Sequence, residues 1–212
     1  MFDPIAQGFR IDIKGSATGV FVTQINLFFK SVSRNNNGVS LFICEMENGY
    51  PNTSRVLPFS ESHVSAQNVQ ISEDASKETT FHFQSPVYLA DQREYAFVIK
   101  PDGNDPDYVL WIADLGGTDT VSGNQIFSPP YASSMFYSYS FSTWTEVQTQ
   151  YVKFELFRAK FTESQGTIAL TNGNHDFFTI SNFSTNSDIK INDFIISSSN
   201  DSYLGTNTSN IA

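Results

Sequence analysis

Cysteine, histidine and charged residues are all scarce in this sequence, and each shortage narrows the kinds of protein it can encode. A single cysteine, Cys44, excludes an internal disulfide and a zinc site made of cysteine ligands. The three histidines, His63, His82 and His175, lie far apart along the chain. With so few of the side chains that most often carry catalysis, we expect a protein that is not an enzyme.

Basic residues are fewer than acidic ones, 12 against 22, so the formal net charge is −10. The lysines and arginines form no run, whereas a protein that binds nucleic acid needs a basic footprint for the phosphates. No apolar stretch reaches the roughly 18 residues of a membrane-spanning helix. We therefore expect neither a nucleic-acid partner nor a membrane partner.

Phenylalanine is abundant, with 20 residues, and much of it falls in alternating patterns. Alternation with a period of two over residues 19–32 predicts a half-buried strand. The Arg-Asn-Asn-Asn-Gly sequence at 34–38 predicts a hairpin turn, with 39–46 as the partner strand. In the strand predicted at 19–32, one face would carry Phe21, Thr23, Ile25 and Leu27, and the other face would carry Val20, Val22, Gln24 and Asn26.

Short strands separated by turn signals continue along the body of the chain. Only residues 60–67 resemble the start of a helix, so a parallel sheet with interleaved helices is disfavoured. The long connections near 60–78 and 114–133 suit crossovers between two sheets. We predict an all-β fold, an antiparallel, jelly-roll-like β-sandwich. Further strands are expected at 79–83, 94–100, 108–113, 134–141 and 151–161.

The composition changes near Thr162. Residues 162–212 contain 5 acidic and 1 basic side chains, and 24 of these 51 residues are Ser, Thr or Asn. Strand-like pieces occur at 167–170, 177–180 and 188–196, but they offer too few apolar residues for an independent core. We therefore predict two parts, a sandwich at 1–161 and a polar β extension, or the start of a further β module, at 162–212.

Several segments, in order along residues 3–161, resemble a β-domain of large tail and baseplate proteins of contractile-tailed bacteriophages, especially marine T-even-like ones. Asp-Pro-Ile-Ala-Gln-Gly-Phe at residues 3–9 is similar to the family's opening Asp-Pro-Leu-Ala-Gln-Thr-Phe, with Ile5 in place of Leu and Gly8 in place of Thr. The other segments that carry the resemblance are 19–23 with 27–30, 46–51 with 56–61, 83–89 with 94–96, and 142–145 with 152–161.

The resemblance implies a structural role in the phage tail, as a baseplate or tail-fibre module without catalytic residues or cofactor. Its partners would be other tail or baseplate subunits, with a homo-oligomer such as a trimer also compatible. It would be made in the cytoplasm of the bacterial host and would reside in the tail of the virion. Family members are much longer, so we expect a fragment or a compact version. The scarcity of charge fits a surface that contacts other proteins.

Five aromatic residues suggest an alternative function, the recognition of host surface glycans. Jelly-roll sandwiches often bind sugars on flat aromatic faces, which stack against C–H groups while polar neighbours read the hydroxyls. The competing interpretation is that these rings pack in the core or across strands, which a phenylalanine-rich chain favours. The candidates are Tyr108, Trp111, Tyr137, Tyr139 and Trp144.

Acidic residues suggest two further sites. Asp102, Asp105 and Asp107 share one loop and supply the oxygen ligands that Ca²⁺ prefers, but their spacing does not match an EF-hand loop. A solvated turn uses the same residue types, so we favour a turn. Carboxylate pairs such as Glu45 with Glu47 could serve a glycosidase, but nothing distinguishes them from ordinary surface charges.

Overall fold

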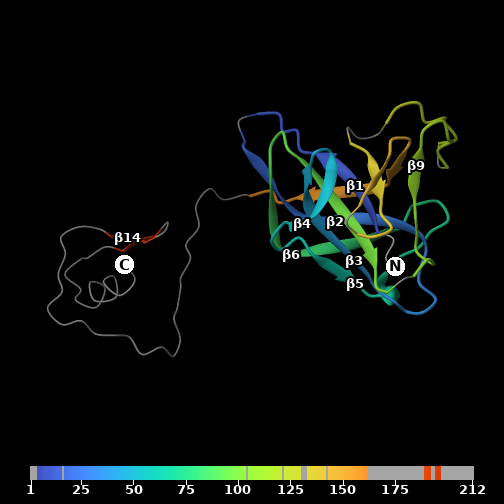
Figure 1. The fold of residues 1–212 in the computed structure, drawn as a ribbon, viewed down its shortest axis with the longest axis horizontal. Coiled ribbons are helices and arrows are strands. Elements are labelled where there is room, and N and C mark those ends of the chain that lie inside the picture. Colours follow the sequence, from blue (N-terminus) through green and yellow to red (C-terminus); the bar gives the residue numbers. More distant parts are fainter. Residues whose placement is uncertain are drawn as a thin grey trace. The chain divides into compact units, whose positions relative to one another are not determined.

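The computed structural model describes residues 4–161, except 16, 104, 121, 130–132 and 142, and also the backbone of two short strands at 189–191 and 194–196 (Figure 1). The chain divides into two units, Met1–Phe161 and Thr162–Ala212. In the second unit, β14 (Ile189–Ile191) pairs antiparallel with β15 (Phe194–Ile196). The predicted strands at 167–170 and 177–180 lie outside the described residues.

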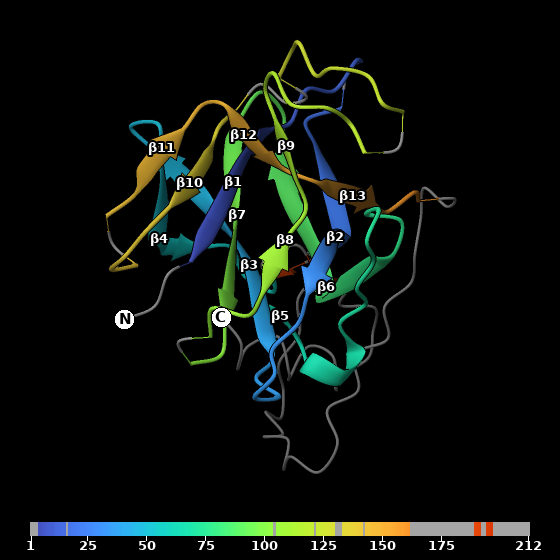
Figure 2. The same ribbon diagram turned by 90° about the vertical axis from the view of Figure 1, so that its right-hand side faces the viewer.

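The first unit contains two main antiparallel sheets, a large sheet and a small sheet (Figure 2). β9 (Ile112–Asp114) and β12 (Gln150–Val152) form a separate pair, and Ala66–Asn68 is a short 3₁₀ helix. The large sheet has the order β11 (Thr145–Val147), β10 (Met135–Tyr137), β1 (Ile5–Arg10), β7 (Glu94–Pro101), β3 (Val39–Glu47), β4 (Tyr50–Val56), with β5 (Ser62–Val64) also paired to β3. The small sheet has the order β13 (Phe154–Arg158), β2 (Gly19–Ser31), β6 (Glu78–Ala90), with β8 (Val109–Leu110) also paired to β2.

The chain passes repeatedly from one sheet to the other. β1 belongs to the large sheet, β2 to the small sheet and β3 to the large sheet again. Later in the chain, β6 belongs to the small sheet, β7 to the large sheet and β8 to the small sheet. Such crossing connections are typical of jelly-roll folds and join the sheets into one sandwich. The predicted all-β, antiparallel, jelly-roll-like sandwich is confirmed. Among the described residues, no helix has the length and apolar character of a membrane span.

The main core lies between the inner faces of the two sheets and is rich in phenylalanine. Phe97 on β7 is fully buried, and its ring lies 6.1 Å from that of Phe9 on β1 and 4.8 Å from that of Phe154 on β13, measured between ring centroids. Phe29 and Phe81 from the small sheet are also fully buried. The abundant phenylalanine therefore builds the sandwich interior, because alternate strand positions face the opposite sheet.

A second, smaller core covers the outer face of the large sheet. Here β1, β7 and β3 carry mostly small or medium side chains, with Phe42 as the exception, and Phe136 on β10 and Trp144 belong to the same cluster. Because β7 and β3 are covered on both faces, residues 95–99 and 41–44 read as continuous apolar runs rather than as alternation. The residues that β1, β3 and β7 contribute to this outer core are Ala6, Phe42, Cys44, Ala96 and Val98.

The buried side chain of Gln7 joins three parts of the sandwich. Its Nε2 donates to the carbonyl oxygens of Gly8, Ser133 and Ser134, at 2.9, 3.2 and 3.1 Å, and its Oε1 accepts the Val152 N–H at 2.9 Å. Its neighbour Gly8 lies against the same segment, since a Cβ placed there would be 2.0 Å from Ser133 Oγ. A side chain at this position, where the resembling family has Thr, would therefore force the Ser133 hydroxyl to move.

Two predicted local structures are wrong. Residues 34–38 do not form a hairpin, because β2 and β3 belong to different sheets and the turn is a crossover between them. β3 pairs instead with β7, β4 and β5. The segment 60–67 begins no longer helix, since it forms β5 followed by a single 3₁₀ turn. In both places a local turn or cap signal was outweighed by pairing with distant strands.

Two predicted strands are divided in the structure. The predicted strand 151–161 is interrupted at Lys153, where the chain leaves β12, paired with β9, and enters β13, paired with β2. The predicted strand 108–113 likewise divides into β8 and β9 on either side of Trp111. Trp111 and Lys153 meet at this change of partner, where the Lys153 N–H donates to the Trp111 carbonyl oxygen at 2.9 Å.

Candidate binding surfaces

The five aromatic residues predicted as sugar-binding candidates do not share one exposed face. Trp144 is only 8% exposed and belongs to the outer core of the large sheet, so its ring is closed to a ligand. Trp111 is half-buried, and its indole N–H donates to the Ser72 carbonyl oxygen at 2.9 Å. Tyr108 lines a pocket between the two sheets. Tyr137 and Tyr139 contact each other edge to face, and of the five only Tyr139 is largely exposed.

The three aspartates of the calcium candidate have separate partners. Asp102 pairs with His63 at 2.8 Å, between its Oδ2 and the histidine Nε2. Asp107 Oδ2 lies 3.8 Å from Arg34 Nε, and Asp105 is buried, so it is not the solvated turn residue that the composition suggested. Over the described part of the chain, no three His, Cys, Asp or Glu side chains are grouped as metal ligands.

The single cysteine and the described histidines have definite places. His82 is exposed on β6, and His63 lies on β5, while His175 is outside the described residues. Cys44 is fully buried in the outer core of the large sheet. Burial raises the pKa of its thiol to about 12, although a hydrogen bond with the Asn52 backbone opposes the shift.

Cys44 is therefore expected to be inert in the folded protein. Thiolate is the reactive form, and a pKa of about 12 leaves almost none at pH 8. We expect a disulfide reagent such as DTNB to modify the folded chain at least 100-fold more slowly than the urea-unfolded chain at pH 8. Because the pKa of the Cys44 thiol is higher in the folded than in the unfolded chain, its contribution to the free energy of unfolding is complete below about pH 8.5. That contribution is lost as the pH rises from there toward about 12. Equal rates in both states would contradict the burial of Cys44.

Exposed aromatic rings gather on the outer face of the small sheet. The ring of Phe21 on β2 lies 5.2 Å from that of Tyr88 on β6 and 5.4 Å from that of Phe161, which follows β13. Phe157 on β13 faces the same side, and all four side chains are between 38% and 67% exposed. We call Phe21, Tyr88, Phe157 and Phe161 the aromatic patch. Contiguous exposed apolar surface of this kind marks interaction sites on soluble proteins.

The sequence pattern did not reveal the aromatic patch because a β-bulge changes the parity of β2. Phe21 has the same parity as Ile25 and Leu27, which are fully buried. The register of β2 against β6 shifts between Val22 and Gln24, so Phe21 faces outward and Val22 faces the core. A bulge inserts one residue and reverses the faces beyond it, and strict alternation cannot show this.

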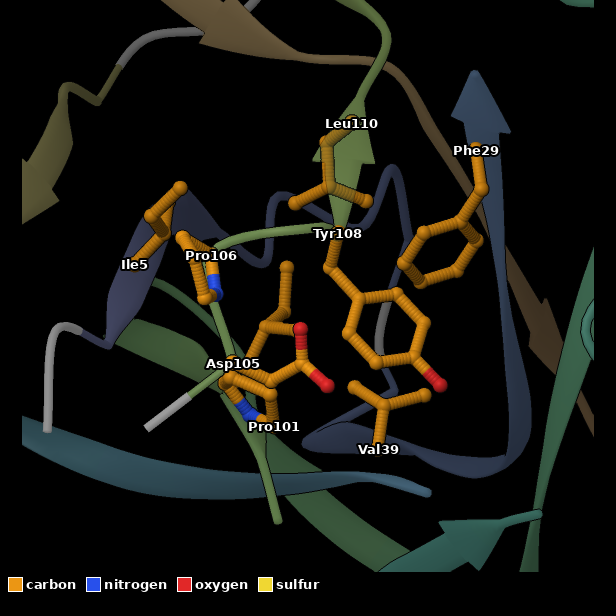
Figure 3. Close-up of a pocket in the computed structure, with 9 residues that line it drawn as sticks. Ile5, Phe29, Val39, Pro101, Asp105, Pro106, Tyr108 and Leu110 are labelled. Atoms are coloured by element: carbon orange, nitrogen blue, oxygen red, sulfur yellow. The ribbon is translucent and has the colours of Figure 1, made fainter. Parts of the chain in front are cut away.

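A pocket of about 130 Å³ lies between the two sheets and is shown in Figure 3. Its walls are mostly apolar and come from strands of both sheets, together with the loop that joins β7 to β8. Tyr108 stands on one side, and its hydroxyl donates to the Asn37 carbonyl oxygen at 2.6 Å. Burial and the nearby carboxylates of Asp105 and Asp102 raise the pKa of Tyr108 to about 12. The lining residues are Ile5, Phe29, Val39, Ile99, Pro101, Asp105, Pro106, Tyr108 and Leu110.

Comparison of the chain with protein-family models and with curated protein sequences found no match. The function of the chain is therefore inferred from its surfaces and from the sequence resemblance.

Proposed function

We propose that this chain is a structural module in the tail of a contractile-tailed bacteriophage. In this proposal it belongs to the baseplate or a tail fibre and acts without catalysis, by contact with neighbouring subunits. The segments that resemble the phage family support it, in their order along the chain. They lie on β1, β2, the β3–β4 hairpin, β6, β7 and β13, which are strands of both sheets.

The observation that carries the contact function is the aromatic patch. Its four large rings are exposed on the outer face of the small sheet and on the segment that follows β13. Aromatic residues are enriched at the centres of protein interfaces because they bury much apolar area with few rotatable bonds. Glycan recognition receives less support, since four of its five candidate rings are buried or half-buried.

Cryo-electron microscopy of virions tests this proposal directly. We expect the sandwich to fit density in the baseplate or tail fibre, with Phe21 and Phe161 buried against a neighbouring subunit. Particles whose tails contain no such density would contradict the structural role. A sandwich that is present in the tail but turns the aromatic patch to solvent would contradict the assigned contact surface.

Substitution in the phage genome gives a second test. Phe21→Ser combined with Phe161→Ser is expected to lower the protein's content per particle at least tenfold, because both rings lose their apolar contact area. Phe127→Ser is the matched control, since Phe127 is 84% exposed and lies outside the aromatic patch. Equal content in both mutant phages would remove the aromatic patch from the assembly contact.

A further inference from the structure

Asp105 is a buried carboxylate that accepts hydrogen bonds from neutral groups. It is 5% exposed, and its donors are the Ser33 hydroxyl, Asn37 Nδ2 at 2.9 Å and the Asp107 N–H at 3.0 Å. The hydrogen bond from Ser33 is the main reason that the pKa of Asp105 lies below its ordinary value, so the group is ionised at neutral pH. A buried negative charge of this kind favours a cation beside it.

Asp105 has no ion-pair partner among the described residues. The ion pairs found there join Arg34 to Asp107, Arg55 to Glu45 and, when the histidine is protonated, His63 to Asp102. The carboxylate of Asp105 instead forms part of the pocket wall, near the Tyr108 ring (Figure 3). The site therefore combines one fixed anionic group with apolar surfaces that come from both sheets.

The size and lining of the pocket define the group that it would accept. Ile5, Val39 and Leu110 offer apolar contact, and Asp105 offers a charge at one place. The cavity of about 130 Å³ has room for several heavy atoms, enough for a short alkyl chain with a compact head group. A lysine side chain has this form, an alkyl stem that packs on apolar surface and a compact cationic tip.

We propose that this pocket binds a primary alkylammonium group, which in the assembled tail is a lysine side chain of a neighbouring subunit. The first part follows from the pocket alone, whereas the assignment to a subunit lysine rests on the proposed structural function. The net charge of −10 favours a partner of opposite charge and disfavours a second copy of this chain. The aromatic patch and this pocket would then be two separate contacts of one module.

Titration of the full chain with n-butylammonium chloride, followed by NMR of the backbone amides, tests the pocket. We expect saturable shifts centred on Tyr108 and Leu110, with a Kd in the millimolar range for so small a ligand. n-Butanol, which has the same stem without the charge, is expected to bind at least tenfold more weakly. Equal binding of the alcohol, or shifts spread over the acidic surface, would overturn the proposal.

Two variants test separately whether binding needs the charge of Asp105 and whether it needs the open cavity. Asp105→Asn is expected to weaken n-butylammonium binding at least tenfold, because it removes the charge and keeps the shape. Leu110→Phe fills the pocket and keeps the carboxylate, so it should also abolish binding even if Asp105→Asn disturbs the loop. Glu61→Gln, at an exposed carboxylate outside the pocket, is the control and should bind normally. Normal binding by both pocket variants would refute the site.

A lysine derivative distinguishes this inference from the proposed function. Nα-acetyl-lysine methylamide should produce the same shifts, and acetylation of its Nε should abolish them, because the cation is lost. If the lysine derivative binds but the chain is absent from phage tails, the pocket stands and the tail function fails. If the chain is found in the tail but no amine binds, the pocket proposal fails and the tail function stands.

Discussion

Gln7→Leu is expected to lower the free energy of unfolding by about 2–4 kcal/mol. The leucine keeps the volume of the side chain but offers no acceptor to the Val152 N–H, and Val152 is fully buried. It also removes the donor that reaches the carbonyl oxygens of Ser133 and Ser134. Each buried polar group left without a partner costs about 1–3 kcal/mol, which sets the expected range. Urea unfolding followed by circular dichroism measures it.

Gln7→Glu gives the same prediction a dependence on pH. An ionised carboxylate would face the carbonyl oxygens of Ser133 and Ser134, so the folded state would favour the protonated acid and its pKa would rise above about 4.3. The protonated acid can donate as the amide does, so the variant should approach the wild type near pH 4. Its stability should fall as the pH rises, and at pH 7 it should be lower than that of Gln7→Leu.

The control for both variants is Gln84→Leu on the exposed side of β6. A surface substitution away from special contacts changes stability by less than about 0.5 kcal/mol. If Gln7→Leu were equally mild, or if Gln7→Glu showed no dependence on pH relative to the wild type, Gln7 would not join the three segments as described. The result matters for the proposed family, because Gln7 belongs to the Asp-Pro-Ile-Ala-Gln-Gly-Phe segment that carries the resemblance.

The fold class could be predicted from the sequence because apolar and polar residues alternate along a strand that has one buried face. Where one side of a strand is buried, as on β6, Phe81 and Phe83 face the core while His82 faces solvent, and the pattern predicts both. The pairing of strands could not be predicted in the same way. The Asn-rich turn at 34–38 has the same residues whether it closes a hairpin or crosses between sheets, and the choice depends on strands far along the chain.

The candidate sites were harder to predict than the fold. The aromatic patch depends on a bulge at residues 22–24, which no period in the sequence reveals. The pocket brings together Ile5, Val39 and Leu110, which are far apart along the chain. The loop around Asp105 has the composition of a solvated turn, yet Asp105 is buried and accepts a hydrogen bond from Ser33, in the connection between β2 and β3. Long-range contacts of this kind leave little trace in local composition.

Phe97→Ala is expected to destabilise the fold more than Gln7→Leu does, with a loss of about 3–5 kcal/mol. Phe97 is fully buried at the centre of the large sheet, so its removal leaves a cavity as well as losing apolar burial. Phe127→Ala is the control, since that ring is 84% exposed and its loss should change stability by less than about 0.5 kcal/mol. Urea unfolding of the full chain measures both variants.

The double variant shows whether Phe97 joins the two sheets. Phe154 lies on β13 of the small sheet, and its ring contacts that of Phe97 edge to face at 4.8 Å. We expect the two alanine substitutions to be non-additive by about 0.5–1.5 kcal/mol, the range for aromatic pairs of this geometry. Strict additivity would contradict direct packing between the sheets. Coupling would show that Phe97 and Phe154 pack directly across the two sheets, so that this pair contributes to holding the small sheet, which carries the aromatic patch, against the large sheet.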